Sequence, residues 1–558
     1  MAASSWEFNA AVTPRLLADK LSKNYMEAGQ GTPGLAREYR QVCLQISQDA
    51  SPRQYNTEAR GPMDKANIEL IDTTPVGEQQ DGPPAVENEV RTLDPLPSDD
   101  PKDPLNWPLW LKIAILVQVS ILAALGSLNV AIINPAYVPL AEEFGIDVVV
   151  ASYQTTIPIA INGIGPFIWV PLANAYGRRP VYLFTTVLGF CSALGCAYTK
   201  NFSQLLVARV FNGLFPAAQT LGAVTVVDLF FLHQRGRAMG FWAVMLTNGS
   251  HLAPIIGGLL GQFLGWRWCF KFAAIFNAFM LLTITLCLPE TLYVRQPSSK
   301  AQDEARQHPG PLTWKVYISC LRPWSRYPGK HLRLDAFVVP SLKMARYPSV
   351  LFPAVYYGVQ YGFASILPAV TVAAIFKARF NFTVLQTGLA YGLALLIGGC
   401  LGELAAGMVV DAIVKREMKK RPDGQVYAEV RLHAIWTGAI LVPVGLLIYG
   451  FCIANAGVHW AGALMGMGIA CFGIQVITTT CYTYSIDCYK TQASEISQLF
   501  NVLRQEFGMT FAFYAVDLGN RIGYQFEFLM FALLGLVVFV PVVALMFNGA
   551  RWRARLQE

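Results

Sequence analysis

The feature that most constrains the fold is a series of apolar runs between residues 113 and 547. Each run has about 20 residues or more, the length that an α-helix needs to cross a bilayer. Six runs precede a polar segment near 290–348, and six follow it. They lie at residues 113–133, 151–172, 181–199, 204–229, 238–262, 268–288, 350–376, 385–410, 433–454, 459–485, 495–517 and 525–547. We therefore expect an all-α membrane protein with twelve transmembrane helices in two six-helix halves.

The composition separates a polar N-terminal segment from this apolar body. Only 14% of the 558 residues are charged, whereas an average soluble domain is about 25% charged. Residues 1–104 are rich in Pro, Gly, Gln and Glu, so we expect a disordered cytoplasmic tail. The predicted order continues with an N-terminal half at 105–289, a cytoplasmic central loop at 290–348, a C-terminal half at 349–548 and a cytoplasmic tail at 549–558.

Charged loops indicate the orientation of the predicted helices. The connection after the first run carries Glu142, Glu143 and Asp147 and no Lys or Arg, whereas the next connection carries Arg178 and Arg179. Basic and less basic connections alternate in this way along the chain, and basic loops of membrane proteins face the cytoplasm. Both termini are then cytoplasmic. The net charge of +7 reflects this topology, and we expect no nucleic-acid partner.

The predicted outer loops contain two further features. Lys377 and Arg379 fall on the outer side, against the overall charge pattern. Asn201 and Asn381 begin two Asn-x-Ser/Thr sequons in outer loops, which makes them candidate glycosylation sites. Sequons so close to the membrane, in a chain this long, carry little weight.

Cysteine and histidine spacing gives no sign of a metal or a cofactor. The eleven cysteines and six histidines are scattered, without the pairs that a zinc site or a disulfide framework needs. We therefore expect cysteines that pack as small hydrophobes, no metal and no cofactor. The N-terminus lacks the pattern of a cleavable signal peptide.

A short polar gap between the second and third runs contains Gly177, Arg178 and Arg179. Glycine permits a tight turn and a close approach of helices. We expect the arginines to reach Asp228, at the end of the fourth run. A charge pair present only when the cytoplasmic ends meet would latch one of two states. The alternative is that the arginines only set the orientation.

The second half has a similar stretch after its own second run, beginning GMVVDAIVKR at Gly407. Each stretch has a small or branched residue, a polar side chain four residues later (Asn174 or Asp411) and then two bases. We expect both to belong to cytoplasmic loops. Corresponding stretches in two halves predict parallel repeats with the substrate site between them near the midplane.

These stretches resemble the cytoplasmic signature between helices two and three of the major facilitator superfamily, Gly-x-Leu-Ala/Ser-Asp-Arg-x-Gly-Arg-Arg. The first stretch departs from it at three positions, where Val170, Asn174 and Ala175 replace the first glycine, the aspartate and the first arginine. In the second stretch, Gly407 and Asp411 match the first glycine and the aspartate, but the later glycine is missing. The resemblance implies a two-half transporter fold.

Other stretches add to this resemblance. Arg209 and Gly213 match the Arg-x-x-x-Gly pattern of helix four, which in relatives is associated with proton coupling. In HLAPIIGG, Pro254, Gly257 and Gly258 match the Gly-Pro-x-x-Gly-Gly signature of proton-coupled antiporters. The stretches DPLNW, DLFFLHQRGRAMGFW and YTYSIDCY are similar to fungal members of the twelve-helix drug:proton antiporter group.

Ionisable residues inside the runs are candidates for the substrate and proton pathway, because they are expensive to bury in lipid. Arg209 is one, although a snorkelling role is the alternative. Glu403 lies centrally in the eighth run between small residues and is the best candidate acid, with a structural hydrogen bond as the alternative. A lone histidine more often packs than transfers protons, so for His251 we favour the structural role.

The eleventh run carries Asn501, Arg504 and Glu506. Asn501 and Arg504 match an Asn-x-x-Arg pattern in fungal relatives. Arg504 and Glu506 are two residues apart, so on a helix they face different sides. Asn129, Gln360 and Tyr361 are uncharged pathway candidates that equally fit helix–helix contacts.

These features favour a proton-coupled secondary transporter, acting as an exporter of small organic molecules by alternating access. Its expected partners are a small-molecule substrate, protons and the lipid bilayer, and we expect a monomer in the plasma membrane, with the vacuolar membrane as the alternative. Uptake of a nutrient or organic cation, or a non-transporting nutrient sensor, remain alternatives. We expect no enzyme, because the runs lack clustered catalytic residues.

Overall fold

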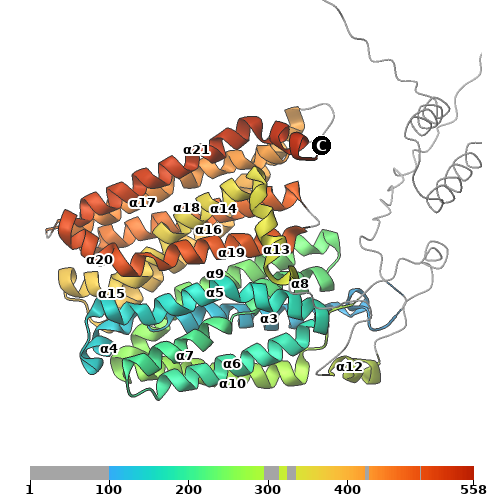
Figure 1. Cartoon of the computed structure of the whole chain (residues 1–558), viewed down its shortest axis with the longest axis horizontal. Helices are drawn as coiled ribbons and strands as arrows, with labels where there is room; N and C mark the ends of the chain where they lie inside the picture. The colour runs from blue at the N-terminus through green and yellow to red at the C-terminus, as the bar shows by residue number, and fades with distance from the viewer. Residues whose placement is uncertain are drawn as a thin grey trace, which may run out of the picture. The chain divides into compact units, whose positions relative to one another are not determined.

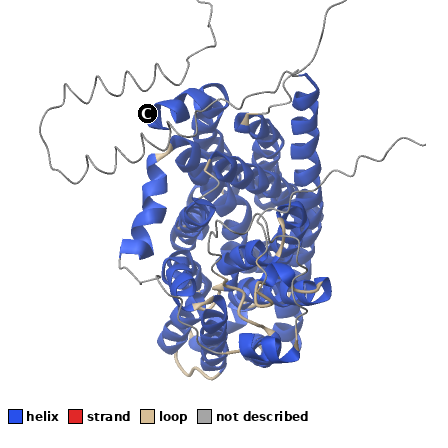
Figure 2. Ribbon diagram, turned by 90° about the vertical axis from the view of Figure 1, so that its right-hand side faces the viewer, coloured by secondary structure: helices blue, strands red, loops and turns tan. Residues whose placement is uncertain are grey.

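The computed structural model describes residues 98, 100–293, 313–322, 335–420, 427–455, 457–489 and 492–557. Nearly all of the predicted N-terminal tail and much of the predicted central loop lie outside the described residues. Regular structure in the described part is helical, and it includes no strand (Figure 2). The predicted all-α class is confirmed.

The N-terminal half consists of the described helices up to residue 287. They are η1 (Pro104–Asn106), α3 (Leu109–Ala131), η2 (Asn134–Ala136), α4 (Tyr137–Phe144), α5 (Val148–Tyr176), α6 (Arg178–Ala197), α7 (Phe202–Leu214), α8 (Ala218–Leu229), α9 (Leu232–Phe263) and α10 (Arg267–Cys287). These helices pack around an apolar core of their own.

Three short helices then lead to the C-terminal half: α12 (Trp314–Cys320), α13 (Asp335–Lys343) and η3 (Met344–Arg346). The C-terminal half has a second apolar core. Its helices are α14 (Pro348–Tyr361), the π-helical η4 (Gly362–Ile366), α15 (Leu367–Phe380), α16 (Val384–Lys420), η5 (Ala428–Ala434), α17 (Ile435–Ala454), α18 (Trp460–Cys488), α19 (Ala493–Met509), α20 (Phe511–Ile522) and α21 (Tyr524–Gln557).

Eleven of the twelve predicted spans are long and apolar enough to cross a membrane. The twelfth, predicted at 495–517, corresponds to α19 and α20, which are separated by Thr510 alone. This segment carries several charged side chains, Arg504 and Glu506 among them, which lowers its hydropathy. The predicted C-terminal tail at 549–558 is helical through Gln557, because α21 continues beyond the apolar run.

The long helices run nearly parallel in Figure 1, with α3 to α10 below and α14 to α21 above. The most extensive contacts between the halves are those of α5 with α19 and of α9 with α16. Glycines bring the backbones close at these contacts. The Cα atom of Gly388 in α16 lies against Gly258 in α9, where a side chain on either residue would collide with the other helix.

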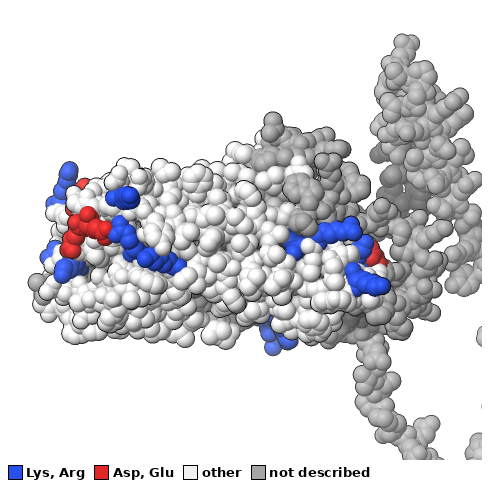
Figure 3. All heavy atoms as spheres, turned by 90° about the horizontal axis from the view of Figure 1, so that it is seen from below, with Lys and Arg blue, Asp and Glu red and all other residues white. Residues whose placement is uncertain are grey.

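The bundle has two ends, which we call the terminal end and the far end. The terminal end holds the start of α3 and the last turns of α21, and the far end is opposite, at the connection between α20 and α21 (Figure 1). On the face seen in Figure 3, charged side chains gather toward both ends and the wide area between them is almost uncharged. An uncharged band between charged ends is what a membrane-spanning bundle requires.

Three spans are interrupted near their middle. Residues 215–217, including Pro216, separate α7 from α8, the π-turn η4 separates α14 from α15, and Thr510 separates α19 from α20. Interrupted helices expose backbone carbonyls, which transporters use at their binding sites. Two predicted site residues, Gln360 and Tyr361, directly precede η4.

Candidate functional site

Arg209 lies in α7 and is fully buried. Its guanidinium donates to the backbone carbonyl of Gln154 in α5 (2.7 Å) and to those of Asn129 (2.8 Å) and Val130 (2.9 Å) near the end of α3, and also to Oδ1 of Asn212 (2.9 Å). The Phe270 ring lies 5.3 Å from its Cζ atom. Arg209 thus joins three helices of the N-terminal half through neutral acceptors.

Two of the uncharged candidates also make internal contacts. Asn129 is buried, and its Oδ1 lies 3.4 Å from Nδ2 of Asn277 in α10. Gln360 is buried and donates to the carbonyl of Gly535 in α21 (3.2 Å), so it contacts a helix of its own half. Both fit the helix-contact role that the sequence left open.

Asn501 and Arg504 lie together in α19, where the C-terminal half meets α5. The Arg504 guanidinium donates twice to Oδ1 of Asn501, from Nε (3.2 Å) and Nη2 (3.0 Å). The Asn501 amide donates in turn to the backbone carbonyl of Asn162 in α5 (3.0 Å). Tyr361 also belongs to this group, because its ring centroid lies 4.9 Å from the Cζ atom of Arg504.

Glu506, two residues further along α19, also faces α5, at Gly163, whose carbonyl lies 3.4 Å from Nδ2 of Asn501. A side chain at Gly163 of α5 would collide with its Oε1, so the carboxyl group lies directly against the α5 backbone. Oε1 is buried and has no hydrogen bond to any described residue. Arg504 and Glu506 form no ion pair with each other, in line with their spacing.

His251 of α9 and Glu403 of α16 lie near the other contact between the halves. The imidazole of His251 is buried, its Nε2 lies 3.8 Å from Sγ of Cys471 in α18, and its Nδ1 has no hydrogen bond to a described residue. The ring packs against Gly399 of α16, where a side chain would collide with it. Glu403 is half-buried one helical turn beyond Gly399.

The helix-five signature explains how α9 approaches its neighbours. At Gly257 a side chain would meet the backbone carbonyl of Ile132, just after α3, and at Gly258 it would meet Gly388 of α16. Pro254 lies inside α9 between His251 and these glycines. The signature thus provides backbone contact with both halves.

At the terminal end, Gly177 separates α5 from α6. Its backbone φ of 108° is a conformation that L side chains rarely adopt, and a side chain would also collide with the Glu290 carboxylate. Both conditions require glycine. Glu290 accepts from the backbone N–H groups of Arg178 (2.8 Å) and Arg179 (3.1 Å), the first two residues of α6.

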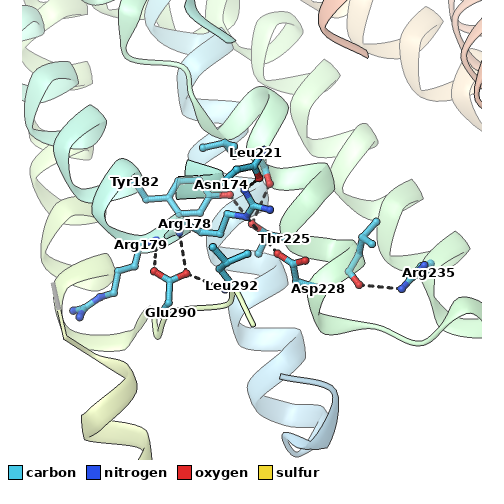
Figure 4. A network of polar contacts seen from close by, with 11 residues as sticks. Asn174, Arg178, Arg179, Tyr182, Leu221, Thr225, Asp228, Arg235, Glu290 and Leu292 are labelled. Carbon is cyan, nitrogen blue, oxygen red and sulfur yellow. Dashed lines mark hydrogen bonds and ion pairs between the residues drawn. The ribbon is translucent and has the colours of Figure 1, made fainter. Parts of the chain in front are cut away.

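Glu290 is the centre of a network shown in Figure 4. Burial raises the pKa of Glu290, while the N–H donations from Leu292, Arg178 and Arg179 oppose that shift. A carboxylate at the start of a helix also interacts favourably with the helix dipole. Sequence analysis missed Glu290, although an acid directly after an apolar run is the signal that could have found it.

Arg178 pairs with Asp228, as predicted. Its Nε lies 3.4 Å from Oδ2 of Asp228 at the end of α8, and its Nη1 donates to Oδ1 of Asn174 (2.6 Å). Asn174 thus contributes although it replaces the aspartate of the signature. Arg179 points away from Asp228 (Figure 4). Its Nη2 donates to the carbonyl of Thr285 in α10 (2.7 Å).

The residues drawn in Figure 4 come from helices of the N-terminal half and, for Glu290 and Leu292, from the segment that directly follows α10. The Arg178–Asp228 pair therefore joins helices of one half. Its geometry does not match the expected latch between the cytoplasmic ends of the two halves. A contact within one half persists when the halves rock, because each half moves largely as a rigid body.

The prediction of a loop at Gly407 is wrong. Residues 407–416 belong to α16, which continues to Lys420, and both Gly407 and Asp411 are exposed on it. The reason is Val414, which stands where the first half has Gly177. A β-branched residue cannot take a positive φ without strain, so the helix does not turn here.

The C-terminal half builds its terminal contacts from other residues. Arg431 of η5 pairs with Asp487 at the end of α18 (2.8 Å), and Glu429 pairs with Arg553 of α21 (2.7 Å). Glu429 and Arg553 were missed, since they lie 124 residues apart in sequence. A further missed acid is Glu527 near the start of α21, which is buried with no hydrogen bond from Oε1 to a described residue.

The two sequon asparagines lie at the far end. Asn201 immediately precedes α7 and is exposed. Asn381 follows α15 with a φ of 52°, and its Oδ1 accepts from Lys377 (3.1 Å). Glycosylation at either residue stays a prediction.

Two helical halves with ionisable groups inside their spans define a multi-pass membrane protein of the transporter class. The chain belongs to the Major Facilitator Superfamily, whose family model matches residues 119–513, more than half of its length. The predicted resemblance is confirmed.

Several fungal relatives are similar over most of the chain. The efflux pump radE of Floropilus chiversii is 27% identical over 464 residues, which cover 82% of this chain and 84% of radE. The MFS transporter fsa7 of a Fusarium species is 30% identical over 414 residues, covering 74% and 79%. The multidrug transporter FLU1 of Candida albicans is 27% identical over 459 residues, covering 79% and 71%.

Two solved structures share the fold. The human organic anion transporter MFSD10 has a TM-score of 0.52 at 17% identity, covering 78% of this chain and 100% of that chain. A bacterial homologue of the human lysosomal transporter Spinster, in an inward-facing unoccupied conformation, has a TM-score of 0.53 at 14% identity, covering 80% and 99%. The two-half architecture is therefore that of known transporters.

Proposed function

We propose that the protein is a proton-coupled secondary active transporter that exports small organic molecules by alternating access. Membership of the superfamily and the names of its relatives, an efflux pump and a multidrug transporter, support export. The helix-five signature, with Pro254, Gly257 and Gly258, supports antiport.

The observation that supports proton coupling is the presence of two separate carboxyl groups inside the spans. Glu403 of α16 and Glu506 of α19 form no ion pair with a described residue. An unpaired carboxylate is expensive to hold in a low-dielectric interior, whereas its protonated form is not. Each group therefore binds a proton while buried and releases it when water reaches it.

Both acids lie on helices that join the halves. Glu506 contacts α5 directly, and Glu403 lies one turn from Gly399, which touches His251 of α9. Rocking of one half against the other changes these contacts and hence the access of water to each acid. This coupling makes the proton part of the transport cycle.

The terminal end faces the cytoplasm in this proposal. It carries the larger share of basic side chains, including Arg235, Arg237, Lys415, Arg416 and Arg551, which follows the positive-inside tendency. We propose the plasma membrane as its location and the monomer as the functional unit. Protease protection of a C-terminal epitope in intact cells tests the orientation.

Proton movement in proteoliposomes tests the function. Purified protein is reconstituted with an internal pH dye, and tetraphenylphosphonium, rhodamine 6G and 2-naphthoate are added in turn. We expect at least one solute to move protons through the wild type, and Glu403→Gln to abolish that flux while solute binding persists. Glu417→Gln, at an acid of the same helix that pairs with Lys420 near its end, is the control and keeps the flux.

The companion variant Glu506→Gln separates the two acids. Loss of flux in only one variant assigns the coupling to that residue. If solutes bind but neither the solutes nor protons cross the membrane, the transport proposal fails and the protein acts as a sensor. Proton flux that survives both substitutions would contradict coupling through these carboxyl groups.

A further inference from the structure

Arg504 stands in a box of aromatic side chains, which we call the tyrosine box: Tyr357 and Tyr361 of α14, Tyr482 of α18 and Phe500 of α19. The Tyr357 ring centroid lies 5.6 Å from that of Tyr482 and 5.9 Å from that of Phe500. The Tyr361 ring lies under the guanidinium, at 4.9 Å from Cζ. These four rings come from three helices of the C-terminal half.

The guanidinium is only partly engaged. Of the five N–H donors that arginine carries, two bond to Oδ1 of Asn501 and one bonds to the Tyr357 hydroxyl (3.2 Å). No carboxylate of the described residues pairs with it. A permanent positive charge at membrane depth therefore keeps two donors for a further acceptor.

The box is closed on one side and accessible on the other. Tyr357 and Phe500 are almost completely buried, whereas Arg504, Tyr361 and Tyr482 are half-buried. Asn501 fixes the guanidinium and also bonds across to α5. The accessible side of the box therefore borders the contact between the two halves, where a transported molecule passes.

We propose that Arg504 and the tyrosine box bind the carboxylate and the ring of planar aromatic acids. This proposal rests on the transport function proposed above and names a substrate class for it. The planar guanidinium fork matches a carboxylate and strengthens as water is excluded. The tyrosine faces offer the apolar contact that a ring needs.

The same geometry disfavours an organic cation at this site. Arg504 repels a positive charge, and Glu506, two residues away on α19, is directed at Gly163 of α5 rather than into the box. A cation would have to bind elsewhere, with Glu403 as its counter-charge.

Binding of three matched probes tests the proposal. The full-length protein in nanodiscs is titrated at neutral pH with 2-naphthoate, its neutral analogue 2-naphthamide and the cation 2-naphthylmethylammonium. We expect the wild type to bind 2-naphthoate at least about tenfold tighter than 2-naphthamide, since a charge-assisted pair contributes more than a neutral one. We expect 2-naphthylmethylammonium to bind most weakly.

Variants separate substrate contact from a structural role. Arg504→Gln is expected to lower 2-naphthoate affinity by about tenfold or more and to leave 2-naphthamide affinity nearly unchanged. Arg504→Lys, which keeps the charge and loses the planar fork, falls between the two. Arg379→Gln, an arginine of the same half over the Tyr524 ring, is the control and behaves as the wild type.

Equal affinity of the wild type for 2-naphthoate and 2-naphthamide would overturn the proposal, and this comparison needs no variant to fold. An equal loss for both probes in Arg504→Gln, or tightest binding of 2-naphthylmethylammonium, would also overturn it. The assay uses no pH gradient. Failure of proton coupling in proteoliposomes therefore leaves its result intact, and failure of probe binding leaves the coupling result intact.

Discussion

The two central arginines of this transporter meet opposite surroundings. Arg209 in the N-terminal half has no exposed surface and bonds to acceptors on three helices. Arg504 in the C-terminal half is half-buried and bonds to two side chains of its own half. The two arginines, each inside a span, therefore have different roles: Arg209 holds helices together, and Arg504 keeps donors free for a ligand.

The two halves also differ in the exposure of charged groups at the terminal end of the bundle. In the N-terminal half, Gly177, Arg178 and Asp228 gather around the half-buried Glu290. In the C-terminal half, Asp411 remains exposed on an unbroken helix, and the Arg431–Asp487 pair is about one-third exposed. The Arg178 side chain is thus far less exposed than either member of the Arg431–Asp487 pair, although the C-terminal half also holds a more buried pair, Glu429–Arg553.

The largest effect expected from this comparison is on stability. Arg209→Gln leaves several buried acceptors without donors, which destabilises the protein by about 3–5 kcal/mol. Arg504→Gln is expected to cost less than about 2 kcal/mol, because it removes three hydrogen bonds from a half-buried site. Loss of the monodisperse size-exclusion peak after heating measures both. Equal losses in the two variants would remove the distinction between the arginines.

The glycines of the two signature stretches give a smaller contrast. Gly177→Ala forces a side chain into a positive φ and against Glu290, with an expected loss of about 1–3 kcal/mol. Gly407→Ala adds a methyl group to an exposed helix with no neighbour within 4 Å, so it should stabilise the protein by up to about 1 kcal/mol. The same heating assay checks both signs, and a stabilised Gly177→Ala would refute the account of this turn.

The smallest effect is expected at the exposed pair of the C-terminal half. Asp487→Asn removes its ion pair with Arg431, whose side chains are both 32% exposed, and such pairs contribute about 0–1 kcal/mol. Asp228→Asn in the N-terminal half is the matched comparison and should cost more, because the Arg178 side chain is only 5% exposed. Heating curves of the two variants at low and high salt measure the difference. A larger loss in Asp487→Asn would reverse the comparison between the halves.

Sequence patterns predicted the helices well, because a bilayer imposes length and apolarity on each span. The pairing of Arg178 with Asp228 was also predictable from two charges at neighbouring helix ends. The path of residues 407–416 was not predictable from the repeat, because the repeat suggests a turn, whereas Val414 at the position of Gly177 favours a continuous helix.

Contacts between distant residues were beyond sequence analysis. Nothing local indicates that Glu429 meets Arg553, or that the Asn501 amide bonds to α5. The tyrosine box is similarly assembled from α14, α18 and α19, whose order in space depends on packing. Glu403 and Glu506 were found as candidates because a charge inside an apolar run stands out by composition alone.

Uphill transport tests the central claim, that a proton on an intramembrane carboxyl group drives the cycle. Proteoliposomes that are acidic inside receive a solute that moved protons in the first assay, and its accumulation is followed with and without a protonophore. We predict that the wild type concentrates the solute until the protonophore is added, whereas Glu403→Gln only equilibrates it. Accumulation by the wild type that does not depend on the pH gradient would contradict the account.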